Sequence, residues 1–209
     1  MTDETAGPHV TTAPRIAGLL LAAGGGRRLG GHPKALLPHR GRPLVEHAAR
    51  ALWDGGCGAV YVVLGAAAER VRQEARLPAC VLVDNAGWAE GMGSSLRAGL
   101  DALSARPDGF DAVLVSLVDQ PGIGAAAVAR VRAAYQGRDT LAAASYRGRR
   151  GHPVLFGAAH WAGVAAGAVG DQGARGYLAA HRDAITLVDC SEVAEPYDID
   201  TAADLARLE

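Results

Sequence analysis

The sequence predicts an α/β fold of three layers, in which helices cover both faces of a mostly parallel sheet. Three observations support this prediction. Apolar runs of strand length alternate with helix-length segments along the 209 residues. The first run, residues 16–22, is continuously apolar, as in a central parallel strand that is covered on both faces. Glycine or aspartate directly follows several of these runs, where parallel strands end at a common edge.

The first half of the chain is the more regular part. Helix 43–53 has Pro43 near its first turn, and Gly55 and Gly56 end it. The elements expected here are strands 16–22, 59–64, 80–83 and 112–118, and helices 43–53, 66–75, 94–103 and 125–135.

The second half is less regular. Segments 140–145 and 153–156 flank a basic turn, 147–152, and are expected to form a hairpin-like excursion. Helices 158–166 and 174–181 and strand 185–188 follow, and Asp200 or Thr201 is expected to cap a short last helix. Because the chain shows no linker or repeat, we expect one domain at 15–209 after a disordered tail at 1–14.

Composition excludes several classes of function. The net charge is −1, with 21 Lys and Arg against 22 Asp and Glu, so bulk attraction to nucleic acid or an anionic membrane is not expected. The three cysteines have no metal-binding spacing, which indicates buried thiols in a reducing compartment, and we expect a cytoplasmic protein without a signal peptide or spanning helix. Zinc-protease and serine-hydrolase motifs are absent from the sequence.

The segment 19–34 is the most informative one. An apolar strand runs into Gly24, Gly25 and Gly26, followed by two arginines and then Lys34. Backbone without side chains lets amide groups close on an anion, and the cations neutralise it, so we predict a polyphosphate cradle. A Walker loop is excluded because Lys34 has Ala35 after it in place of a hydroxyl residue.

A dinucleotide fingerprint fails as well. A motif that starts at Gly24 would need glycine at position 29, which is leucine. The second strand ends in Gly65, where the fingerprint requires an acidic residue for the ribose.

Two carboxylates are candidate magnesium ligands. Asp119 follows the buried strand 112–118, and a partly desolvated carboxylate beside a phosphate site needs a cation. Asp200 is the best second ligand, because magnesium–phosphate sites take one or two carboxylates. The alternatives stay open that Asp119 forms a turn before Pro121 and that Asp198 and Asp200 cap a helix.

Weaker signals complete the candidate site. Asn85, Ser94 and Ser95 could hold a nucleobase or sugar, although an ordinary helix cap explains them equally well. The basic turn with Arg150 and His152, and Arg175 at a helix start, suit an anionic second substrate. A solvated hairpin tip is the alternative.

These motifs resemble the MobA-like nucleotidyltransferases, especially their molybdenum-cofactor cytidylyltransferase branch. Leu21-Ala-Ala-Gly24 with Arg28, Gly30 and Lys34 is similar to the family signature, and Val118-Asp-Gln-Pro121 is similar to its metal-binding motif. The segments 91–96, 151–153, 170–175 and 198–201 resemble motifs of the cytidylyltransferase branch. The resemblance covers nearly all of 16–208.

The resemblance implies a Rossmann-like three-layer α/β/α fold of the nucleotide-diphospho-sugar transferase type. It implies transfer of CMP from CTP to the phosphate of molybdopterin, with Mg²⁺ and release of pyrophosphate. A molybdoenzyme or its maturation chaperone is a further implied partner. Arg28, Lys34 and Asp119 would be catalytic, and Asp119 and Asp200 would hold the metal. Arg150, His152 and Arg175 would bind the acceptor. The nucleotide would be bound by Leu21, Ala22, Ala23, Gly24, Gly25, Gly26, Arg28, Lys34, Asn85, Ser94 and Ser95.

One position departs from the family pattern, and other functions stay open. Gly26 stands where relatives often have Ser or Thr, which removes a hydroxyl contact to phosphate. The Ala-Ala-Gly form of the signature is typical of relatives that use CTP. The alternatives are another small phosphorylated acceptor, an NAD(P)H-dependent oxidoreductase of the nicotine-blue type, and a module that binds the cofactor without chemistry.

Overall fold

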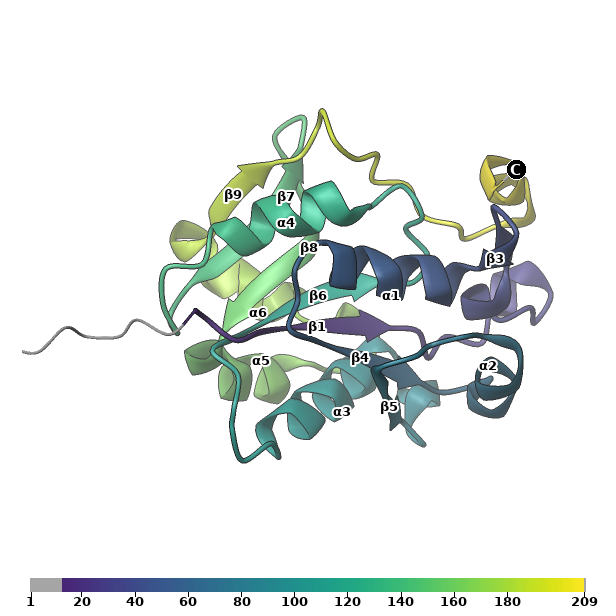
Figure 1. Cartoon of the computed structure of the whole chain (residues 1–209), viewed down its shortest axis with the longest axis horizontal. Helices are drawn as coiled ribbons and strands as arrows, with labels where there is room; N and C mark the ends of the chain where they lie inside the picture. Colours follow the sequence, from purple (N-terminus) through teal and green to yellow (C-terminus); the bar gives the residue numbers. More distant parts are fainter. Residues whose placement is uncertain (1–12, 209) are drawn as a thin grey trace, which may run out of the picture.

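A seven-stranded sheet forms the middle layer of the molecule (Figure 1). The computed structural model describes residues 13–208, so the tail predicted for 1–14 lies almost wholly outside the described residues. The strand order is β5-β4-β1-β6-β8-β7-β9. The strands are β1 (Ile16–Leu21), β4 (Ala59–Leu64), β5 (Cys80–Asp84), β6 (Ala112–Leu117), β7 (Leu141–Tyr146), β8 (Arg149–Gly157) and β9 (Thr186–Asp189).

Helices cover both faces of this sheet. One buried cluster joins it to α1, α2 and α4, and a second joins the opposite face to α3, α5 and α6. The predicted three-layer fold is therefore confirmed. The helices are α1 (Leu44–Asp54), α2 (Ala68–Glu74), α3 (Met92–Ser104), α4 (Ala125–Ala133), α5 (Trp161–Gly167) and α6 (Arg175–Ala180).

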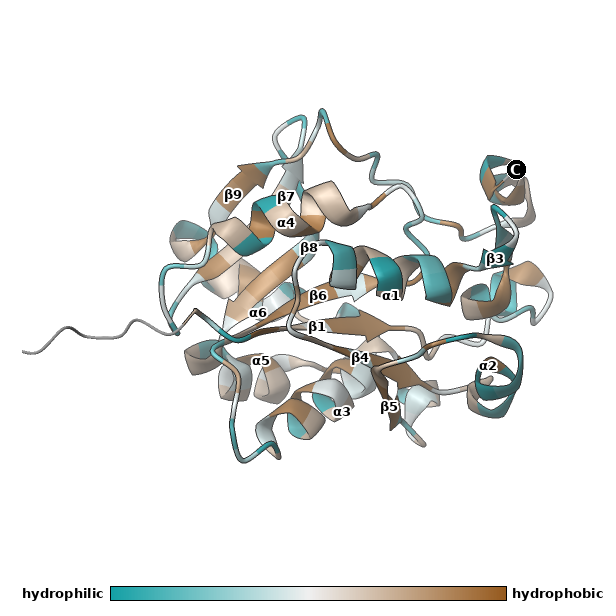
Figure 2. Ribbon diagram, viewed as in Figure 1, coloured by the Kyte–Doolittle hydropathy of each residue, from teal (hydrophilic) through white to brown (hydrophobic). Residues whose placement is uncertain are grey.

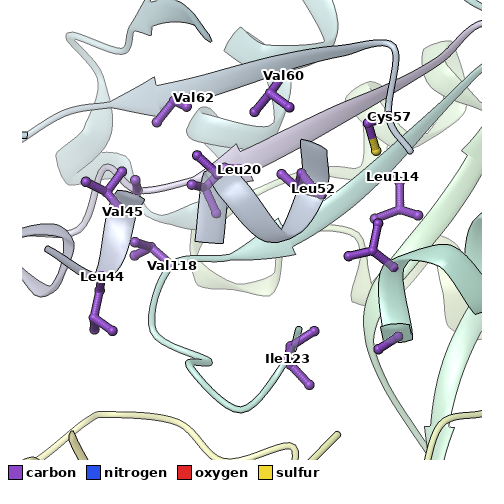
Figure 3. Close-up of a cluster of buried hydrophobic side chains, with 14 of the residues drawn as sticks. Leu20, Leu44, Val45, Leu52, Cys57, Val60, Val62, Leu114, Val118 and Ile123 are labelled. Atoms are coloured by element: carbon purple, nitrogen blue, oxygen red, sulfur yellow. The ribbon is translucent and has the colours of Figure 1, made fainter. Parts of the chain in front are cut away.

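Hydrophobic packing explains why the central strands have continuous apolar runs. All six residues of β1 are buried, because α1 covers one face and α3 covers the other. Figure 3 shows Leu20 of β1 beside Leu44, Val45 and Leu52 of α1. The helices themselves alternate apolar and polar side chains, with the apolar ones against the sheet (Figure 2). None of the helices in residues 13–208 is long and apolar enough to cross a lipid bilayer.

The hairpin predicted in the second half is present, but it is part of the main sheet and not an excursion from it. β7 and β8 do form an antiparallel hairpin, but β8 pairs with β6 and β7 pairs with β9 in the main sheet. The turn is short, since Tyr146 pairs with Arg149 and only Arg147 and Gly148 lie between them. Both have positive φ, 51° and 76°, as a two-residue hairpin turn requires.

The topology brings the candidate residues together. β1, β4, β5 and β6 run parallel, so their carboxyl ends share one edge of the sheet. β8 is antiparallel to β6, and its first residues therefore lie at that same edge. The glycine segment, the aspartate after β6 and the basic hairpin thus meet there.

Candidate active site

The glycine segment after β1 closes into a tight loop. The carbonyl oxygen of Gly26 accepts hydrogen bonds from the amides of Leu29 (2.8 Å) and Gly31 (3.1 Å). Gly26 has a φ of 62°, and a Cβ atom added to it would collide with the carbonyl oxygen of His32. The loop in this conformation therefore requires glycine at position 26, where the family pattern often has a hydroxyl residue.

The open side of this loop offers hydrogen-bond donors and positive charge. Within residues 13–208, the amides of Gly24, Gly25 and Gly26 have no hydrogen-bond acceptor. A Cβ atom added to Gly24 would meet nothing within 4 Å. Arg27 and Arg28 are exposed, and neither forms an ion pair with another described residue. Free amides beside free guanidinium groups suit an anionic ligand.

The other residues predicted to contact a nucleotide here are engaged with β4 or face elsewhere. The amide of Ala22 donates to the carbonyl of Val63 (3.0 Å), and the carbonyl of Ala23 accepts from Ala66 (3.1 Å). Leu21 lines the neighbouring cavity described below. Their backbone holds the loop in place at the end of β1.

Lys34 joins the two predicted metal ligands. Its ammonium Nζ lies 2.7 Å from Oδ2 of Asp119 and also contacts Oδ1 of Asp200. The side chains of Lys34 and Asp119 are only 18% and 20% exposed, whereas that of Asp200 is 42% exposed. Asp119 and Asp200 lie 85 and 166 positions after Lys34 in the sequence, and the fold brings both to its ammonium group.

Burial and charge act against each other at this junction. Burial alone would lower the pKa of Lys34, but the two carboxylates outweigh it and raise that pKa above its usual value. Burial raises the pKa of Asp119, and the adjacent Lys34 ammonium opposes this only in part. Lys34 is therefore charged at neutral pH.

The same two carboxylates fit a divalent cation. Both direct an oxygen at one cationic centre, and carboxylate oxygens are the ligands that Mg²⁺ prefers. Within residues 13–208, no group of three or more His, Cys, Asp or Glu side chains could hold a metal. Further ligands would have to come from phosphate and water, as is usual for Mg²⁺.

The C-terminal segment that carries Asp200 is pinned to the end of β6. Ile199 is fully buried, and its amide donates to the carbonyl of Asp119 (2.9 Å). On one side of it, Asp198 accepts a hydrogen bond from Nε2 of Gln120 (2.8 Å). On the other side, Asp200 faces Lys34.

Of the two predicted helix caps, Thr201 directly precedes the 3₁₀ segment and its carbonyl accepts from the amide of Asp204 (3.0 Å), but the side-chain hydrogen bonds are made by Asp204. The carboxylate of Asp204 accepts from the amides of Asp200 (3.1 Å) and Thr201 (2.7 Å), and the Thr201 hydroxyl donates to it as well. The 3₁₀ segment Ala202–Leu208 is thus capped from within. This arrangement leaves the Asp200 carboxylate free to face Lys34.

A large cavity adjoins the junction. Its volume is about 880 Å³, and Leu21, Leu96, Val115 and Phe156 are among its apolar lining residues. The three residues predicted for the acceptor are among its polar lining residues, which are Gln120, Tyr146, Arg147, Arg149, Arg150, His152, Gln172, Arg175, Ser191, Glu195, Tyr197, Asp198 and Arg207. None of the five arginines forms an ion pair with another residue in 13–208. The cavity therefore suits an anionic ligand with an apolar part.

The imidazole in this cavity is uncharged at neutral pH. Burial lowers the pKa of His152 to about 4; Asp198 opposes this shift, and Arg175 and Arg150 reinforce it. The hydroxyl of Tyr146 donates to the carbonyl of His152 (2.7 Å) and fixes the backbone there. His152 can therefore serve as a neutral hydrogen-bonding group beside cationic arginines.

Asn85, Ser94 and Ser95 lie together at the end of β5, away from solvent. Nδ2 of Asn85 donates to the hydroxyls of Ser94 (2.8 Å) and Ser95 (3.0 Å), and Oδ1 accepts from the amide of Gly87 (3.0 Å). The hydroxyl of Ser94 also donates to the carbonyls of Gly87 and Gly91. All three side chains are buried and bound to one another, so what they hold in this structure is the loop 85–91.

A family model matches most of the chain, from β1 to the start of β9. The model described as the MobA-like NTP transferase domain covers residues 18–185. The chain belongs to the MobA-like NTP transferase family. The family comprises nucleotidyltransferases, and the fold and site position found here agree with that activity.

This MobA-like NTP transferase is similar to an oxidoreductase and to mycobacterial proteins of solved structure. The nicotine blue oxidoreductase of Paenarthrobacter nicotinovorans is 43% identical over 204 residues, covering 95% of this chain and 98% of that protein. The crystal structure of the Mycobacterium tuberculosis Rv0371c homologue from Mycobacterium sp. strain JC1 has a TM-score of 0.78 and 31% identity, and covers 93% of this chain and 98% of that one. A manganese complex of Rv0371c has a TM-score of 0.75 and 27% identity, with 93% and 97% covered.

Sequence reasoning missed several residues of this MobA-like site. Gln120 is part of the motif Val118-Asp-Gln-Pro121, but no function was predicted for it. Its Nε2 donates to Asp198, and its Oε1 is buried without a hydrogen-bond partner among the described residues. Arg207 and Tyr197 line the cavity from the C-terminal segment, with the Arg207 guanidinium 4.0 Å from the Tyr197 ring centre. The position of Gln120 directly after Asp119 was the one available signal.

Proposed function

We propose that this nucleotidyltransferase moves CMP from CTP to the phosphate of a molybdopterin-type acceptor and releases pyrophosphate. The observation that carries the proposal is the Lys34 junction, at the same edge of the sheet as the glycine cradle and the arginine-lined cavity. This arrangement offers separate places for a nucleoside triphosphate and for an anionic acceptor.

Each group would have a distinct task. The free amides of Gly24–Gly26, with Arg28 and Lys34, would bind the triphosphate. Arg150 and Arg175 would orient the acceptor phosphate, and neutral His152 would hydrogen-bond to it. An acceptor oxygen would attack the α-phosphorus, and the bond from that phosphorus to the β-phosphate oxygen would break. The residues would act by positioning and by neutralising charge, because phosphoryl transfer needs no covalent nucleophile.

Asp119 and Asp200 would hold Mg²⁺ in the loaded enzyme. The metal would supply charge neutralisation for the phosphate oxygens. The solved manganese complex of Rv0371c supports the binding of a divalent ion by proteins of this kind. CTP, molybdopterin, magnesium and a molybdoenzyme partner rest on the sequence resemblance.

Pyrophosphate release tests the proposal. We expect release from CTP and Mg²⁺ in the presence of molybdenum cofactor, with weaker release from GTP, ATP and UTP. The matched control is the Asp119→Asn variant, which keeps the shape of the side chain and removes its charge. Absence of release with all four nucleotides would reject the proposal.

A second function is favoured by one specific observation. The relative that is 43% identical across 95% of this chain is named a nicotine blue oxidoreductase. Under this alternative, a hydride from NADPH and a proton from solvent would reduce a quinone-like dye. The arginines at 147–150 could meet the 2′-phosphate, whereas Gly65 after β4 gives NADH no ribose carboxylate. Dye-dependent oxidation of NADPH without CTP would establish it.

A further inference from the structure

Trp88 differs from the other two tryptophans of the chain. Trp161 is 8% exposed, and its Nε1 donates to the carbonyl of Phe156 (3.0 Å). Trp53 packs against a buried core cluster. Trp88 is 36% exposed and belongs to neither core cluster of the described residues. An exposed indole outside both core clusters is available to a ligand.

The backbone around Trp88 is held firmly. Its amide donates to the carbonyl of Asn85 (3.3 Å), and its carbonyl accepts from the amide of Gly91 (3.2 Å). The buried cluster of Asn85, Ser94 and Ser95 anchors both ends of this turn. The indole is therefore presented from a fixed loop.

Two glycines bring this indole against the cradle. A Cβ atom added to Gly25 would lie 3.4 Å from Cζ3 and 3.6 Å from Cη2 of Trp88. At the end of β4, a Cβ on Gly65 would lie 2.6 Å from Cβ of Trp88 and 2.7 Å from the carbonyl oxygen of Ala23. The tryptophan thus lies directly beside the cradle loop, and the neighbouring Gly24 faces open space.

We propose that the Trp88 indole is the stacking surface for the base of the nucleotide whose phosphates occupy the cradle. This inference rests on the proposed function, because it needs a nucleotide there. Every nucleobase has a π face, and stacking on an exposed aromatic ring is a sequence-tolerant source of affinity. It places the base beside Gly24 and Gly25. Asn85, Ser94 and Ser95 then act as positioning residues for the loop.

Paired titrations with CTP and inorganic tripolyphosphate test this role. The two ligands share the polyphosphate, and only CTP carries a base. We expect Trp88→Ala to weaken CTP binding by about 5- to 150-fold and to leave tripolyphosphate binding unchanged. Trp88→Phe should retain most of the CTP affinity, and Trp88→Leu, which is apolar without a π face, should lose it. Leu187→Ala is the matched control, since Leu187 is 52% exposed on the far edge strand β9.

The outcomes separate this inference from the proposed function. Equal CTP affinity of wild type and Trp88→Ala overturns the stacking role and leaves the proposed function intact. Equal weakening of CTP and tripolyphosphate also overturns it, because Trp88 would then merely support the loop. A wild-type protein that binds tripolyphosphate but none of the four nucleoside triphosphates overturns both. Quenching of tryptophan fluorescence by CTP, lost in Trp88→Phe, supports it.

Discussion

The Lys34 junction and the arginine-lined cavity lie at the same edge of the sheet, but charges are paired in the first and largely unpaired in the second. At the junction one ammonium contacts two carboxylates, so the charges are paired within the protein. In the cavity five arginines have no carboxylate partner among residues 13–208. The positive charge of the junction is therefore balanced within the protein, whereas the cavity has an excess of positive charge that suits an anion.

The largest expected effect comes from breaking the junction. Asp119→Asn removes one of the two charges that hold Lys34, and turnover should fall by about 100- to 1,000-fold or more, as for other losses of charge stabilisation in a transition state. Steady-state pyrophosphate release measures this. Asp183→Asn is the control, since Asp183 is exposed outside the site. Turnover within threefold of wild type would show that the Lys34 junction is not catalytic.

A substitution in the cavity should weaken acceptor binding and leave the fold unchanged. Arg175→Gln should weaken binding of the anionic acceptor by about 10- to 100-fold, the range for loss of a hydrogen bond to a charged group. The KM for nucleotide and the melting temperature should stay unchanged, because Arg175 has no ion-pair partner in the described chain. Arg106→Gln, an exposed position outside the cavity, is the control. An equal rise in both KM values would contradict the separation of the two regions.

The loop that leads to the junction is sensitive to an added methyl group. Gly26→Ala places a side chain at a φ of 62° and against the carbonyl of His32. We expect a loss of at least about 1–2 kcal/mol in the free energy of unfolding, the cost of left-handed backbone, together with weaker nucleotide binding. Urea denaturation measures the first quantity. Gly24→Ala meets no neighbour and should be nearly neutral for stability.

The smallest effect at neutral pH concerns His152. Its pKa is about 4 in the folded protein and ordinary in the unfolded chain, so between these values the unfolded chain binds more protons. Stability should therefore fall as the pH drops from about 6.5 towards 4, by at most about 1.4 kcal/mol per pH unit. His152→Gln should flatten this slope and change little at pH 7. An unchanged slope would assign the pH dependence to other groups.

Prediction from sequence succeeded where one signal determined the structure. Strand 59–64 is found as predicted, because a continuous apolar run is typical of a strand covered on both faces. The pairing of β8 with β6 was not predictable, since the apolar pattern of 153–156 is the same in a separate hairpin and in the main sheet. Long-range pairing leaves no local pattern.

The same limit applies to the site. That Asp119 and Asp200 would approach each other followed from strand ends that share one edge, and their metal role stays a prediction. That Lys34 would lie between them did not follow, because its direction depends on the closed loop at Gly26. Arg207 reaches the cavity from the 3₁₀ segment Ala202–Leu208, and no local sequence pattern places this arginine there.

Buried Ile199 carries a consequence for how such an enzyme can change. Asp198 lines the cavity and accepts from Gln120, Asp200 contacts Lys34, and buried Ile199 between them holds both in place. Three consecutive residues thus contribute one carboxylate to the cavity and one to the Lys34 junction. A mutation that displaces Ile199 would shift both compartments at once. The cavity and the Lys34 junction are therefore mechanically linked, and evolution could adjust one alone only by changes elsewhere, such as in the hairpin or the glycine loop.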